Sequence, residues 1–165
     1  MNRTHVAETH TLAVLVENKA GVLARVAGLF ARRGFNIDSL AVAPTDERLS
    51  RITIVVDAES APLDQIMKQL DKLINVVDIE ELAPESSALR EMMMVHLEVD
   101  HDSKFDEVLQ LVSGFNGAVL RVRGREMILS LSSRPEDLDA FLVKLQPFGI
   151  VELQRTGAIA LPGIE

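Results

Sequence analysis

Apolar residues in the first half of the chain form two kinds of pattern that alternate along the sequence, one typical of strands and one typical of helices. "TLAVLVEN" at 11–18 is β-branched and apolar, which predicts a strand. Helical spacing follows, ending at Gly34, a typical helix stop. The apolar residues at that spacing are Val22, Leu23, Val26, Leu29 and Phe30. Strands are predicted at 36–45, 49–58 and 76–82. A second helix is predicted with Pro62 near its start, and its apolar stripe reaches Ile74. The order β-α-β-β-α-β is that of a ferredoxin-like domain.

The second half repeats that order after a polar stretch, "APESSALRE". Strands are predicted at 92–100, 118–125, 126–133 and 150–161, and helices at 103–117 and 135–149. We therefore predict an α+β fold of two tandem ferredoxin-like domains, each an antiparallel four-stranded sheet with two helices on one face. The predicted boundaries are an N-terminal tail at 1–10, a first domain at 11–83, a linker at 84–91 and a second domain at 92–165.

The size, charge and composition of the chain limit the kinds of partner that it can bind. A chain of 165 residues can bury the cores of two small domains. No apolar run approaches the roughly 18 residues of a membrane span, and the N-terminus lacks a secretory signal. The absence of cysteine excludes disulfides and thiolate sites. A net charge of -8 disfavours binding to a phosphate backbone. We expect a cytoplasmic protein with no membrane or nucleic-acid partner.

The first strand is apolar on both faces, because Leu12, Val14 and Val16 alternate with Ala13 and Leu15. A sheet with one face in water alternates apolar and polar residues instead. The second face or the sheet edge is therefore expected to pack on another copy or on a partner, and we predict a homodimer.

The corner between the first strand and the first helix has two interpretations. Asn18 could cap the helix while Gly21 turns the chain. Alternatively, the amides of Ala20 to Leu23 could hold a carboxylate, since the first turn of a helix has unpaired N–H groups and a favourable dipole. Asn18 would then accept a hydrogen bond from an ammonium group, and Val22 and Leu23 would supply apolar surface. The second interpretation suits an amino acid with an aliphatic side chain.

Other functions fit the sequence less well. Acylphosphatases share this element order but hold phosphate with a loop arginine, whereas the loop cation here is Lys19. RNA-recognition domains stack bases on strand aromatics, and no aromatic is predicted on a strand here. The histidines show no metal-ligand spacing, and no catalytic constellation is found. We expect no metal site and no catalytic residues.

A longer motif is more specific. "ENKAGVLARVAGLFARRGFNIDSLAVAPTD" followed by "LSRITIVVD" resembles the N-terminal ACT domain of the small, regulatory subunit of acetohydroxyacid synthase, also called acetolactate synthase. The resemblance covers the first half and continues through the linker to "RTGAIAL". The chain departs from the family's pattern in a longer leader and in a loop "TDERLSR" that is one residue shorter.

The resemblance implies a subunit without catalysis or cofactors of its own. In that family the large subunit carries thiamine diphosphate, magnesium and FAD, and the small subunit raises its activity and confers feedback inhibition by valine. Valine lies between the ACT domains of a dimer. By position, the implied ligands are Asn18, Ala20, Gly21, Val22 and Leu23 of one chain with Asn36 and Ile37 of the other. Leucine or isoleucine is not distinguished from valine, since one methylene changes binding by only about 1–3 kcal/mol. The alternative is a free-standing ACT-domain amino-acid sensor without an enzyme partner.

Overall fold

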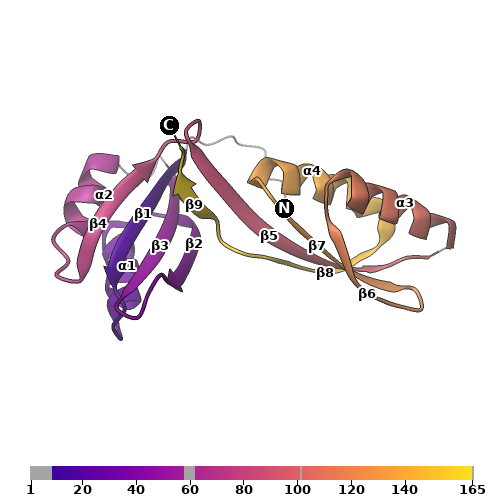
Figure 1. Ribbon diagram of the computed structural model, residues 1–165, viewed down its shortest axis with the longest axis horizontal. Helices are drawn as coiled ribbons and strands as arrows, with labels where there is room; N and C mark the ends of the chain where they lie inside the picture. Colours follow the sequence, from indigo (N-terminus) through magenta and orange to yellow (C-terminus); the bar gives the residue numbers. More distant parts are fainter. Residues whose placement is uncertain (1–8, 58–61, 101, 165) are drawn as a thin grey trace. The chain divides into compact units, whose positions relative to one another are not determined.

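The computed structural model describes residues 9–57, 62–100 and 102–164, which form two compact units (Figure 1). The first unit comprises the chain up to Ala88 together with the residues from Ala158 onward. The second unit is Leu89–Gly157. Within the described ranges, no helix is both long and apolar enough to cross a membrane.

The first unit contains the predicted β-α-β-β-α-β order. Its elements are β1 (Thr9–Glu17), α1 (Val22–Arg33), β2 (Ile37–Pro44), β3 (Leu49–Asp57), α2 (Leu63–Leu70) and β4 (Val76–Leu82). The strands form a sheet of order β2-β3-β1-β4 in which neighbours are antiparallel. The central pair β1 and β3 aligns Leu12 with Ile54 and Val14 with Ile52.

The core of the first unit lies between one face of this sheet and the two helices. Alternate residues of β1 and β3 are buried there because successive side chains of a strand point to opposite faces. The helices contribute residues at three- and four-residue spacing. The buried cluster is Leu12, Val14, Val16, Val22, Val26, Leu29, Phe30, Ile52, Ile54, Val56, Ile66 and Leu70. The predicted face of α1 is confirmed except at Leu23, which is 38% exposed.

The second unit repeats the architecture. Its elements are β5 (Ser87–Glu98), α3 (Asp102–Gly114), β6 (Ala118–Arg123), β7 (Glu126–Ser133), α4 (Pro135–Leu145), a 3-10 turn (Gln146–Phe148) and β8 (Ile150–Arg155). The sheet order is β6-β7-β5-β8. Its separate core includes Val95, Leu97, Val108, Leu129 and Phe141. The predicted fold class of two tandem ferredoxin-like α+β domains is thus confirmed.

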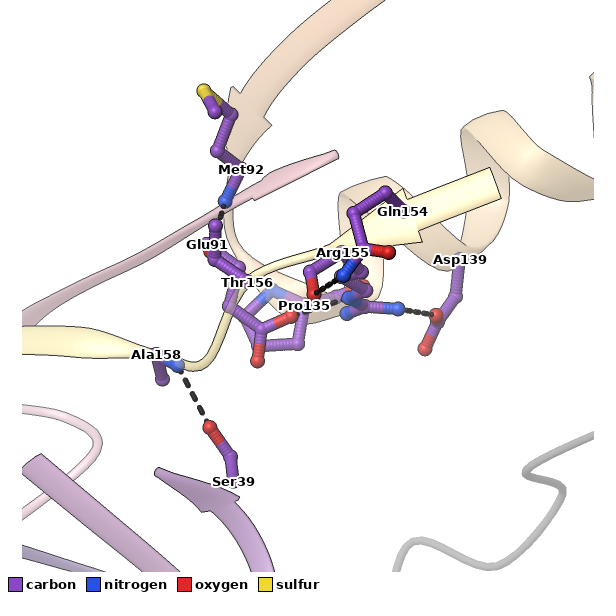
Figure 2. Close-up of polar contacts among 9 residues, drawn as sticks. All are labelled: Ser39, Glu91, Met92, Pro135, Asp139, Gln154, Arg155, Thr156 and Ala158. Carbon is purple, nitrogen blue, oxygen red and sulfur yellow. Dashed lines mark hydrogen bonds and ion pairs between the residues drawn. The ribbon is translucent and has the colours of Figure 1, made fainter. Parts of the chain in front are cut away.

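Arg155, the last residue of β8, ties three segments of the second unit together (Figure 2). Its guanidinium contacts the carboxylate of Glu91 on β5. Nη1 donates to Oδ1 of Asp139 at 2.5 Å, and Nη2 donates to the carbonyl oxygen of Pro135 at 3.2 Å. Burial lowers the pKa of Arg155, but the bonds to Asp139 and Glu91 outweigh burial and raise it.

The C-terminus differs from the prediction. The single strand expected at 150–161 is two strands, β8 and β9 (Ile159–Pro162), and the chain from Ala158 onward belongs to the first unit. β9 pairs with β5, whose first two residues lie in that unit. The amide of Ala158 donates to Oγ of Ser39 on β2 at 2.7 Å (Figure 2). The predicted second domain at 92–165 thus includes residues that lie in the first compact unit.

The segment from Ala158 onward covers part of the sheet face of the first unit that points away from the helices. Ser39 aligns with Val55, and Val55 aligns with Thr11, so the three side chains share that face. Thr11, Ala13 and Thr53 are buried there although both helices lie on the other side. Ala158 and Ala160 are also buried, at 1% and 5% exposure. The second apolar face of the first strand is thus partly covered by the chain's own C-terminal segment.

Three smaller boundaries also differ. Of the predicted tail at 1–10, residues 1–8 lie outside the described residues, while Thr9 and His10 extend β1, where Nδ1 of His10 is 2.9 Å from Oε1 of Glu81. The predicted linker at 84–91 is shorter, because β5 begins at Ser87. The apolar stripe of the second helix ends at Leu70, and Ile74 lies beyond α2 with 89% of its surface exposed.

Candidate functional site

The corner between β1 and α1 is built around Gly21, the N-cap of the helix. Its φ of 83° and ψ of -3° lie in the left-handed region, which costs an L-residue roughly 1–2 kcal/mol. A Cβ added at Gly21 would meet no heavy atom within 4 Å. The backbone is therefore open on the side where a side chain would stand, and a ligand can approach it closely.

Three amides at this corner are unpaired. The amide of Asn18 donates to the carbonyl of Arg48 at 2.7 Å, and the amide of Val22 donates to the carbonyl of Lys19 at 3.3 Å. Within the described part of the chain, no backbone or side-chain acceptor receives the amides of Ala20, Gly21 and Leu23. Unpaired N–H groups at the positive end of a helix of 12 residues form a ready anion site.

Asn18 does not cap the helix. Gly21 occupies the N-cap position, and no side chain makes a capping hydrogen bond there. Asn18 is exposed, and its side-chain amide has no partner among the residues that the structure describes. The capping interpretation of Asn18 is therefore wrong, and its oxygen and nitrogen are free to meet a ligand.

Val22 and Leu23 were both predicted to supply apolar surface at the site, but only Leu23 does so. Val22 is 4% exposed and packs in the core of the first unit, where it anchors the first turn of α1. Leu23 is 38% exposed and is the residue of the pair that offers apolar surface at the corner.

Asn36 and Ile37 lie far from the corner within one chain. Ile37 aligns with Val56 on β3, whereas Glu17, beside the corner, aligns with Leu49. Those two positions of β3 are seven residues apart, a span of about 23 Å. Asn36 donates to Oδ1 of Asp38 at 2.9 Å, and Ile37 packs against the core. The predicted site is therefore not assembled by a single chain.

A polar network beside the corner was not predicted. Nζ of Lys19 donates to Oε1 of Glu17 at 3.0 Å, and Nδ2 of Asn75 donates to Oε2 of Glu17 at 2.5 Å. Nη1 of Arg25 donates to Oδ1 of Asn75 at 2.6 Å. The hydrogen bond from Asn75, and then that from Lys19, lower the pKa of Glu17. Glu17 and Arg25 both lie in the motif that begins "ENKAGVLARV". Asn75 is 58 residues from Glu17, and no sequence pattern indicates that the two residues are in contact.

The fold and the corner together define an ACT domain, a four-stranded antiparallel sheet with two helices on one face and a glycine at the first strand–helix corner. Residues 12–78 match the sequence profile described as "AHAS small subunit-like ACT domain". Residues 90–163 match the profile described as "Small subunit of acetolactate synthase".

Relatives match almost the whole chain. The acetolactate synthase small subunit of Mycobacterium bovis is 47% identical over 155 residues, which are 93% of this chain and 92% of the relative. The small subunit of Mycolicibacterium smegmatis is 44% identical over 154 residues, 93% of this chain and 90% of the relative. The crystal structure of the Thermotoga maritima small subunit superposes with a TM-score of 0.88 at 35% identity and covers 96% of this chain and 99% of that one. The chain belongs to the acetolactate synthase small-subunit family.

Proposed function

We propose that this chain is the non-catalytic regulatory subunit of an acetohydroxyacid synthase of branched-chain amino-acid biosynthesis. In this proposal it binds the large, catalytic subunit in the cytoplasm, raises its rate of acetolactate formation and confers feedback inhibition by valine. Thiamine diphosphate, magnesium and FAD belong to the catalytic subunit. Membership of the small-subunit family supports the pairing, and the open corner at Gly21 is the observation that supports an amino-acid effector.

The corner suits the three parts of an α-amino acid. The free amides of Ala20, Gly21 and Leu23 would receive the carboxylate, because they combine unpaired donors with the helix dipole. The side-chain oxygen of Asn18 would accept a hydrogen bond from the ammonium group. The exposed side chain of Leu23 would contact the aliphatic part of the ligand.

A homodimer would complete this site. β2 is an edge strand of the first unit's sheet, and its Val42 is 45% exposed. Two copies paired antiparallel along β2 would bring the start of one strand beside the end of the other. Asn36 and Ile37 of a second copy would then approach the corner from which they are separated within one chain.

The test is reconstitution with the large subunit encoded in the same genome. The purified chain, supplied with pyruvate and all cofactors, should form no acetolactate, and adding it to the large subunit should raise the rate. Valine should then lower the rate of the mixture. Acetolactate formation by a clean preparation of this chain alone would contradict the proposal. A chain that binds valine but neither co-purifies with the large subunit nor activates it would instead be a free-standing sensor.

A further inference from the structure

We infer that Asn75 is a positioning residue of the corner, holding the loop from Glu17 to Gly21 in the conformation that receives the effector. The inference rests on the proposed effector site and identifies a residue that holds it in place. Asn75 follows α2 and precedes β4, so it reaches the corner from a different part of the chain.

Asn75 joins three segments of the first unit. Its Nδ2 donates to Glu17, the residue at which β1 ends, and its Oδ1 accepts from Arg25 in the first turns of α1. The backbone adds a further bond, because the amide of Glu17 donates to the carbonyl of Asn75 at 2.9 Å. The loop of the corner begins at Glu17, and Arg25 lies one helical turn beyond its other end. Asn75 thus contacts residues that flank the loop on both sides.

The amide side chain is chemically suited to this place. Glu17 is an acceptor and Arg25 is a donor, so the residue between them must both donate and accept, which an asparagine amide does. Each bond includes a charged group, and such bonds are stronger than those between neutral groups. An aspartate in place of Asn75 could still accept from Arg25 but would place a second carboxylate against Glu17.

Lys19 has a lesser part in the network. It is itself in the loop and pairs with Glu17, and its side chain is 65% exposed. Exposed ion pairs contribute little, so Lys19 does not fix the loop as Asn75 does. The pairing also engages the cation of the loop itself, which leaves the free amides as the groups that select a carboxylate.

Binding is sensitive to loop order because the apparent dissociation constant rises as the fraction of loops in the competent conformation falls. We expect Asn75→Ala to weaken valine binding roughly tenfold, corresponding to a competent fraction of about a tenth. Asn75→Asp should weaken it at least as much, because two carboxylates then face each other. The double variant Glu17→Gln/Asn75→Asp exchanges donor and acceptor, because the introduced glutamine amide can donate to the introduced carboxylate. This variant should recover affinity to within about threefold of wild type.

The experiment is equilibrium dialysis of labelled valine against the full-length chain. Gln65→Ala is the matched control, because it removes an exposed amide side chain of α2 that has no hydrogen-bond partner in the described ranges. A carbon-13 titration of Glu17 gives a second reading, since its pKa should rise in Asn75→Ala even where the fold is unchanged.

The outcomes separate the inference from the proposed function. Weaker binding in both single variants, with recovery in the double variant, supports the inference. Wild-type affinity in Asn75→Ala and Asn75→Asp overturns it, and so does a double variant no better than Asn75→Asp. A wild-type chain that binds neither valine, leucine nor isoleucine overturns the proposed effector site itself.

Discussion

Replacing Gly21 by aspartate should abolish feedback inhibition while leaving the chain folded. The position has a φ of 83°, so any L-residue there costs about 1–2 kcal/mol. No atom lies within 4 Å of the added Cβ, so no steric clash is added to that cost. Since domains are stable by about 5–15 kcal/mol, the variant should remain folded.

The loss of feedback comes from charge. A carboxylate introduced at this position would stand roughly 5 Å from the carboxylate of a bound amino acid, close enough for strong repulsion. At an effective dielectric constant of about 20 the repulsion is about 3 kcal/mol, which corresponds to a loss of affinity of roughly a hundredfold. Gly21→Ala adds the Cβ without the charge, so it separates the steric effect from the electrostatic effect.

The assay is acetolactate formation by the reconstituted enzyme against rising valine. Gly124→Asp is the matched control, because Gly124 also has a positive φ of 59° and no atom within 4 Å of an added Cβ, but lies in the second unit. The control should show the wild-type inhibition curve. If Gly21→Asp also follows the wild-type curve, the corner only turns the chain. If Gly21→Ala shifts the curve as far as Gly21→Asp, charge is not the cause.

Three further predictions concern the proposed effector site, Arg155 and Glu17. Asn18→Ala should weaken valine inhibition by roughly ten- to a hundredfold, because the ligand loses one hydrogen bond to its charged ammonium group. Asn36→Ala should act across the dimer, so that mixed dimers keep one working site. Unchanged inhibition curves would contradict both expectations. Arg155→Met should lower the free energy of unfolding of the second unit by about 3 kcal/mol, measured by urea titration. The reason is that Glu91, whose side chain is only 10% exposed, loses the cation that pairs with it. A change below about 1 kcal/mol would show that the second unit does not depend on this ion pair. The pKa of Glu17 is lowered in the folded chain. Its contribution to stability is therefore complete above its pKa in the unfolded chain, about 4.3, and is lost as the pH falls through its pKa in the folded chain. Asn75→Ala should reduce this acid dependence of stability, and acid unfolding profiles identical to those of wild type would refute the prediction.

The helices and strands that bury one face could be predicted from sequence. The β-branched and apolar residues of β1 predict a strand, the helical apolar spacing of α1 predicts a helix, and Gly34 marks the end of α1 with a left-handed conformation. β9 could not be predicted in its place, because "AIAL" is apolar throughout and its small residues carry no periodic signal. Its position depends on contacts distant in sequence, such as that between Ala158 and Ser39.

The candidate site was predictable only in part. Asn18 and Gly21 stand in a continuous motif next to a helix start, where unpaired amides are expected on general grounds. The sequence left capping by Asn18 open as one interpretation because a left-handed glycine, which needs no capping side chain, cannot be distinguished in sequence from a glycine that follows a cap. Asn75 was missed because its role depends on the packing of a distant segment against β1.

The return of the last residues to the first unit has a consequence for synthesis on the ribosome. Chains usually fold from the N-terminus, with each domain complete as it emerges. Here the sheet face that carries Thr11 and Ala13 stays uncovered until Ala158 and Ala160 have left the ribosome, which happens only after the whole second unit has been made. A premature stop codon that removes only the segment from Ala158 onward should therefore leave the second unit intact and expose apolar surface on the unit that was made first.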